Sequence, residues 1–150
     1  MEYLIIVFIL FLAITPILHF LPTRRQKLVT KLRNAALDNG LFVEFRKDQT
    51  LAKSILNHDG EESEIIFYGL RVPFVVGVER KSETWIREEE GWISTTKFNQ
   101  FPIVLNNLPT GVFAAKADIR CYGIYWTEKG EVKDVKNISR VLTTWASSTD

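Results

Sequence analysis

The chain opens with a run of apolar residues that differs from everything after it. From Tyr3 to Leu21, nineteen residues pass without an Asp, Glu, Lys or Arg, and fourteen of them are Leu, Ile, Val or Phe. A helix of this length runs about 28 Å at about 1.5 Å per residue, close to the hydrocarbon thickness of a bilayer. A helix in a globular core would show a polar stripe at helical spacing, and residues 4–14 have none. The pattern predicts a transmembrane anchor over residues 1–22.

The residues that flank this run predict its processing and its orientation. A cleavable signal peptide needs a basic start and small residues at the cleavage site, whereas this run begins with Met1-Glu2 and ends in His19-Phe20-Leu21-Pro22. We therefore expect an uncleaved signal anchor. Cations follow at once, and Lys and Arg are retained on the cytoplasmic side. The expected protein is single-pass, with its N-terminus outside and its C-terminal domain in the cytoplasm.

A basic juxtamembrane helix is expected over residues 23–40. Thr23 and Gln26 have the spacing of a capping box, and Gly40 is placed to end the helix in a left-handed conformation. The cations of this segment either contact the headgroups of the bilayer or only fix the topology, and the helix lies either on lipid or on the domain. Its narrow apolar stripe is Leu28, Leu32, Ala35 and Ala36. The membrane-proximal basic residues are Arg24, Arg25, Lys27, Lys31 and Arg33.

The remaining residues, 41–150, are expected to form one cytoplasmic α+β domain. Alternating apolar residues and turn signals predict consecutive hairpins, and therefore a mostly antiparallel sheet. Short helices are expected over residues 51–56 and 103–107. An amphipathic C-terminal helix is expected to begin near Asp134. The apolar stripe of this C-terminal helix is Val135, Ile138, Val141, Leu142 and Trp145. The expected strands are Leu41–Arg46, Glu64–Val72, Phe74–Glu79, Thr84–Glu88, Trp92–Thr95 and Ala117–Thr127.

Charge and cysteine content exclude several kinds of partner and site. From Pro22 onward the sequence has 19 Lys and Arg and 17 Asp and Glu, which gives a net charge of about +2. Duplex binding usually needs a concentrated basic face, so we expect no nucleic-acid partner. Cys121 is the only cysteine, so one chain can build neither an intramolecular disulfide nor a zinc site of the Cys-x-x-Cys type.

No stretch of the chain carries a catalytic motif. A Gly-rich phosphate loop, a Gly-x-Ser-x-Gly motif and a His-Glu-x-x-His motif are all missing from the sequence. His19 is interpreted as an interfacial polar tip, and His58-Asp59 as part of a turn. The acidic run Glu88 to Glu90 is interpreted as a solvated hairpin tip, and Cys121 as a small core residue. We predict no catalytic, cofactor-binding or metal site, and no small-molecule substrate.

Tryptophans are the best candidates for contact with another protein. Four tryptophans exceed what a domain of this size needs for packing, and tryptophan is enriched where interfaces hold most of their binding energy. The candidate partner surface is Trp85, Trp92 and Trp126, and the alternative is that these rings fill the core of a thin sheet.

The start of the chain resembles a known family of membrane proteins. A single span that ends in Pro22, followed by Arg24-Arg25-Gln26-Lys27 and a basic helix, resembles the YajC-type accessory subunit of the preprotein translocase. The chain is also similar to uncharacterised bacterial single-span inner-membrane proteins sometimes given that label. That second similarity extends to Leu108-Pro109-Thr110-Gly111-Val112 and to residues 123–130. The resemblance implies an inner-membrane location and, for the YajC type, a translocase-accessory role.

The function expected from these observations is a membrane-anchored, non-enzymatic protein-interaction module on the cytoplasmic face of a bacterial inner membrane, with protein partners of unknown identity. The alternative is an accessory subunit of a larger, translocase-like membrane complex that packs through its transmembrane helix. Thr15, Pro16 and His19 would then contact neighbouring subunits. An enzyme that uses Cys121 or His58 ranks last.

Overall fold

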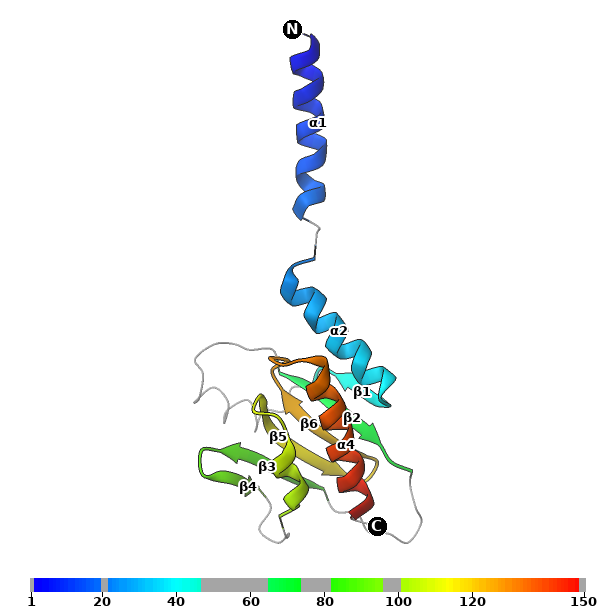
Figure 1. The fold of residues 1–150 in the computed structure, drawn as a ribbon, viewed down its shortest axis with the longest axis vertical. Helices are drawn as coiled ribbons and strands as arrows, with labels where there is room; N and C mark the ends of the chain where they lie inside the picture. The colour runs from blue at the N-terminus through cyan, green and yellow to red at the C-terminus, as the bar shows by residue number, and fades with distance from the viewer. Residues whose placement is uncertain (1, 20–21, 47–64, 74–81, 96–100, 149–150) are drawn as a thin grey trace. The chain divides into compact units, whose positions relative to one another are not determined.

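The computed structural model describes residues 2–19, 22–46, 65–73, 82–95 and 101–148, with side chains in the first helix up to Ala13. The chain divides into two compact units, residues 1–30 and residues 31–150. Its elements appear in Figure 1. In order they are α1 (Glu2–His19), α2 (Arg24–Asp38), β1 (Leu41–Glu44), β2 (Ile66–Arg71), β3 (Glu83–Glu88), β4 (Gly91–Ser94), the 3-10 helix η1 (Ile103–Asn107), β5 (Val112–Asp118), β6 (Cys121–Trp126) and α4 (Val132–Ser148).

Helix α1 corrects the prediction of a transmembrane anchor over residues 1–22. Among the described residues, no helix combines the length and the apolar character that crossing a membrane requires. The expected single-pass anchor, its N-out orientation and the inner-membrane location are therefore wrong. The large apolar side chains from Tyr3 to Leu12 are nevertheless 53–83% exposed.

The start of α2 confirms the expected capping box. The backbone N–H of Thr23 donates to Gln26 Oε1 at 2.8 Å, and the backbone N–H of Gln26 donates to Thr23 Oγ1 at 3.2 Å. Each side chain thus satisfies a donor that the first helical turn leaves without an intrahelical partner. At the other end Gly40 has a φ of 77°, the left-handed conformation expected after a helix.

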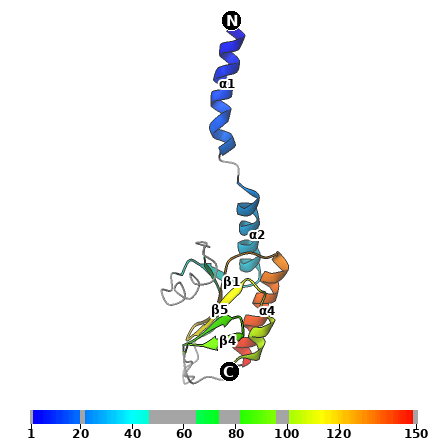
Figure 2. The same ribbon diagram turned by 90° about the vertical axis from the view of Figure 1, so that its left-hand side faces the viewer.

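The second unit is built on one antiparallel sheet of six strands, in the order β1-β2-β6-β5-β3-β4. The predicted α+β class with a mostly antiparallel sheet is confirmed for this unit. Viewed along the sheet, α4 and η1 cover one of its faces (Figure 2). The predicted strands that begin at Leu41, Glu64, Thr84 and Trp92 correspond to β1, β2, β3 and β4.

The predicted strand from Ala117 to Thr127 is wrong, because the chain turns inside it. Asp118 pairs with Cys121, so β5 and β6 form a hairpin around Ile119 and Arg120. Asp118 Oδ1 accepts the N–H of Ile119 at 2.8 Å, a local bond of the kind that favours turns. The apolar alternation runs through this turn without interruption, so the pattern concealed it.

One face of the sheet forms the main core with the helices. The expected apolar stripe of α4 is fully buried there, together with Ala146. Leu32, Ala35 and Ala36 of α2 are buried in the same cluster, while Leu28 is 36% exposed. The second half of α2 therefore packs on the domain, which decides between the two placements left open by the sequence.

The opposite face of the sheet carries a smaller aromatic cluster around Phe67. Phe67 is fully buried and packs against Tyr125, with the two ring centroids 4.9 Å apart. Gly69 and Gly123 face each other on β2 and β6. A Cβ atom on Gly123 would overlap the Phe67 ring, so this position requires glycine.

Two elements expected from the sequence lie outside the described residues. These are the short helix over residues 51–56 and the strand Phe74–Glu79. The short helix expected at Ile103–Asn107 is confirmed and has 3-10 geometry.

Candidate functional site: a groove between η1 and α4

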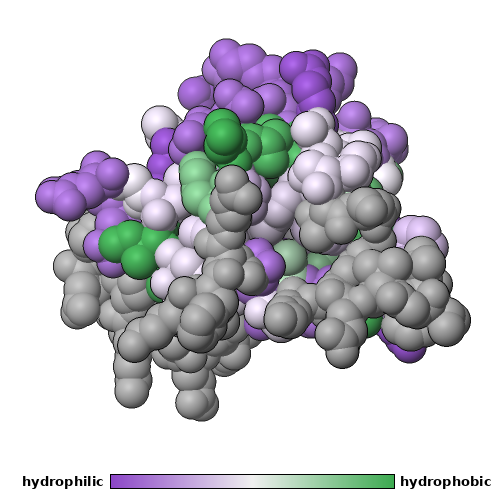
Figure 3. Space-filling view, turned by 90° about the horizontal axis from the view of Figure 1, so that it is seen from below, coloured by the Kyte–Doolittle hydropathy of each residue, from purple (hydrophilic) through white to green (hydrophobic). Residues whose placement is uncertain are grey.

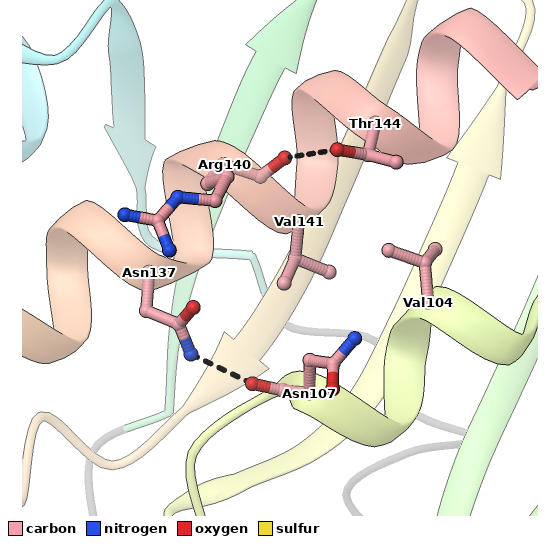
Figure 4. Close-up of a pocket in the computed structure, with 6 residues that line it drawn as sticks. All are labelled: Val104, Asn107, Asn137, Arg140, Val141 and Thr144. Atoms are coloured by element: carbon pink, nitrogen blue, oxygen red, sulfur yellow. Dashed lines mark hydrogen bonds between the residues drawn. The ribbon is translucent and has the colours of Figure 1, made fainter.

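A groove of about 450 Å³ opens between η1 and α4. Apolar and polar side chains share its lining. Val104 of η1 and Val141 of α4 lie side by side, and amide, hydroxyl and guanidinium groups surround them (Figure 4). Ligand sites typically have volumes of about 300–1,000 Å³, so this groove is at the small end of that range. Its lining residues are Val104, Asn107, Asn137, Arg140, Val141 and Thr144.

The η1 wall is held in place by contacts with the sheet. Leu105 is buried in the main core, and its N–H donates to the carbonyl of Pro102 at 2.9 Å. Arg87 of β3 donates to the carbonyls of Leu108 and Pro109 at 3.4 and 3.0 Å, directly after η1. These bonds fix the end of a short helix that five residues could not stabilise alone.

The α4 wall follows from helical spacing. Positions 137, 140, 141 and 144 are separated by three or four residues and therefore share a face. Asn137 Nδ2 donates to the carbonyl of Asn107 at 2.7 Å, which ties α4 to η1 across the groove. Thr144 Oγ1 donates within its own helix to the carbonyl of Arg140 at 2.9 Å (Figure 4).

The groove has a positive electrostatic character. Arg140 is exposed, and its guanidinium has no ion pair or hydrogen bond with the part of the chain that the structure describes. None of the six lining residues is acidic. An anionic group entering the groove would therefore meet an unneutralised cation, and no carboxylate among the described lining residues would repel it.

A second polar arrangement lies at the connection between β6 and α4. The Glu128 side chain is only 4% exposed, and it accepts bonds from Arg33 Nε at 2.9 Å, Arg33 Nη2 at 2.8 Å and the Tyr68 hydroxyl at 2.8 Å. Burial raises the pKa of Tyr68 well above its ordinary value of about 10, and the neighbouring carboxylate raises this pKa further. Glu128 has a φ of 53°, a left-handed conformation that is costly for a residue other than glycine. We interpret this cluster as a clamp that joins α2, β2 and the start of α4.

The structure buries most of the tryptophan surface proposed from the sequence. Trp85 is 3% exposed and Trp126 is fully buried, both in the main core, while Trp92 is half-buried and packs on that core. The indole N–H groups of Trp85 and Trp126 have no hydrogen-bond partner among the described residues. The two buried rings have no area to offer a partner, so the core alternative holds for them.

The basic residues grouped on the sequence have different environments. Arg24, Arg25, Lys27 and Lys31 are exposed on α2. Arg33 is half-buried and paired with Glu128, so this cation stabilises the domain. The grouping by sequence missed the difference because the partner of Arg33 lies 95 residues away.

The remaining candidates for chemistry do not assemble into a site within the described residues. Cys121 is buried on the aromatic face, beside the guanidinium of Arg46. Glu88, Glu89 and Glu90 are exposed at the hairpin between β3 and β4. His58 and the side chain of His19 lie outside the part that is described. In the described residues, no three His, Cys, Asp or Glu side chains are grouped so that they could hold a metal ion.

Sequence reasoning missed the groove. Neither Asn137 nor Arg140 belongs to a sequence motif that indicates a binding site. The signal that was present is the i, i+3, i+4, i+7 spacing of Asn137, Arg140, Val141 and Thr144, which groups polar residues around a valine. Its meaning depends on η1 lying opposite, which spacing alone does not predict.

Comparison of the chain with protein-family models, with curated proteins and with solved structures finds no significant match. The resemblance to YajC-type proteins therefore stays a prediction.

Proposed function

We propose that the protein is a non-enzymatic interaction module that binds a segment of a partner protein in the η1–α4 groove. The observation that carries this proposal is the composition of the groove. Two valines form an apolar floor, and the Asn107 amide and the Arg140 guanidinium at its rim have no partners in the described chain. Specific sites combine an apolar surface with a few placed polar groups in this way.

The openness of the groove favours a peptide segment over a free small molecule. Asn107, Arg140 and Thr144 are exposed, so a small molecule would keep much of its surface in water. A segment of a partner protein gains further contacts on either side of the groove. On the end of the domain seen in Figure 3, the coloured hydrophobic residues form small patches among hydrophilic ones.

The test is selection of peptides on the full-length chain. A phage-displayed library of random heptapeptides is selected against the wild-type protein, and the recovered peptides are measured against Thr144→Trp, whose indole would fill the groove. We expect this substitution to weaken binding at least ten-fold.

The matched control is Thr143→Trp. Thr143 is the adjacent residue, is also exposed, and makes the same kind of bond, from its Oγ1 to the carbonyl of Ser139 at 2.8 Å. It does not line the groove, so binding should survive. Recovery of no peptide above background, or of peptides that bind the Thr144→Trp and wild-type proteins equally, would contradict the proposed function.

A further inference from the structure

We infer that the η1–α4 groove recognises an Asp or Glu side chain of the bound segment, with Arg140 as its ionic partner. This inference rests on the proposed function and names the chemistry of the partner at that site. The occupant is an acidic segment within the chain of a partner protein.

Charge complementarity is the first argument. The groove holds one cation, Arg140, and no acid among its lining residues. The acidic residues at the start of α4, Glu131 and Asp134, are engaged elsewhere. Glu131 pairs with Lys133 at 3.0 Å, and Asp134 Oδ2 accepts the N–H of Glu131 at 2.8 Å. A carboxylate is the anionic group that a peptide supplies, and a guanidinium fork can bind its two oxygens together.

The amides beside Arg140 provide the second argument. Asn137 Nδ2 already donates to the carbonyl of Asn107, which leaves Asn137 Oδ1 as an acceptor. The Asn107 side-chain amide has no partner in the described chain and lies on the opposite wall. One free acceptor and one free amide suit a peptide backbone, which carries both an N–H and a C=O at each residue.

The apolar floor provides the third argument. Val104 and Val141 lie side by side with the polar groups (Figure 4). A bound segment would place an aliphatic side chain on the valines while its acidic side chain reaches Arg140. This arrangement predicts peptides that combine an Asp or Glu with a nearby aliphatic residue.

The test uses the heptapeptides selected as above, synthesised with an acetylated N-terminus and an amidated C-terminus so that no terminal carboxylate contributes. Each acidic residue is replaced in turn by its amide. We expect one replacement per peptide to weaken binding about five-fold, because a solvent-exposed ion pair contributes at most about 1 kcal/mol. Raising the salt concentration should reduce the difference, since exposed charges are screened.

The protein variants locate the effect. Arg140→Gln should remove the preference for the acidic peptide over its amide. Lys136→Gln, which removes an exposed cation one turn away on the same helix and outside the groove, should keep it. Groove-dependent peptides without an acidic preference, or a preference unchanged in Arg140→Gln, would overturn the inference and leave the proposed function standing. Recovery of no groove-dependent peptide would overturn both.

Discussion

Replacing Glu128 by Gln removes a buried negative charge that Arg33 and Tyr68 share. The carboxylate accepts two bonds from the Arg33 guanidinium, at 2.9 and 2.8 Å, and one from the Tyr68 hydroxyl, at 2.8 Å. A glutamine of nearly the same shape keeps one acceptor oxygen but turns an NH₂ group toward a donor. The expected result is a loss of stability without a large cavity.

The structure sets the size of this loss. Hydrogen bonds to charged groups contribute about 1.5–3 kcal/mol, and leaving a buried group unsatisfied costs about 1–3 kcal/mol. The Arg33 side chain is 30% exposed, so water still solvates part of the cation when its partner loses its charge, and the upper end of these ranges does not apply. We expect Glu128→Gln to lower the free energy of unfolding by about 2 kcal/mol, which for a unit of this size lowers the melting temperature by about 8 °C.

Tryptophan fluorescence during denaturation by urea is a suitable assay, because all four tryptophans lie in residues 31–150 and report on that unit. The matched control is Glu131→Gln. Glu131 pairs with Lys133 at 3.0 Å, but both side chains are at least 70% exposed, so no measurable change is expected.

A double-mutant cycle with Arg33→Gln checks the assignment to one ion pair. We expect the two substitutions to be less damaging together than the sum of their separate effects, because each already breaks the same bonds. Equal stability of Glu128→Gln and Glu131→Gln, or strict additivity with Arg33→Gln, would refute the interpretation of Glu128 as a clamp.

Two further predictions concern the two faces of the sheet. Gly123→Ala should lower the free energy of unfolding by about 3 kcal/mol in urea titration, because its Cβ would overlap the buried Phe67 ring. The control is Gly111→Ala, which should be tolerated because its Cβ would lie 3.6 Å from the nearest atom. The free energy of unfolding should also fall as the pH rises above about 10. Folding raises the pKa of Tyr68, so the unfolded chain loses the hydroxyl proton at a lower pH than the folded chain does. The contribution of Tyr68 to stability therefore declines between the unfolded-state and the folded-state pKa. Tyr68→Phe should reduce the steepness of that decline, and an unchanged pH profile would contradict the assignment.

Local patterns predicted the helices of the domain well, because their signals do not depend on distant residues. The capping box at Thr23 and Gln26, the left-handed Gly40 and the apolar stripe of α4 were all confirmed. The strand that spans Ala117 failed because a two-residue turn is hidden in continuous alternation. Apolar periodicity predicts what can be buried, but it does not mark where a chain reverses inside an apolar run.

The burial of the tryptophans and the existence of the groove could not be predicted for a different reason. A tryptophan suits both an interface and a core, and only the packing of η1 and α4 on the sheet decides that Trp85 and Trp126 are core residues. The groove joins Asn107 to Asn137, residues 30 positions apart. Its existence depends on how two helices meet, which no single segment encodes. The expected anchor failed because apolar composition alone does not make a helix long and apolar enough to span a membrane.

The clamp and the groove are connected through α4. Glu128 fixes the chain just before α4, and α4 forms a wall of the groove. Stability and binding should nevertheless separate. Helix α4 is also held by its buried stripe and by Ser139, whose Oγ donates to the carbonyl of Asn39 at 3.0 Å. The Glu128→Gln protein should therefore be less stable than the wild type, yet bind the selected peptides equally well at temperatures where it is folded. The Arg140→Gln protein should be as stable as the wild type but bind the acidic peptides more weakly. Loss of both properties in Glu128→Gln would mean that the clamp itself shapes the groove.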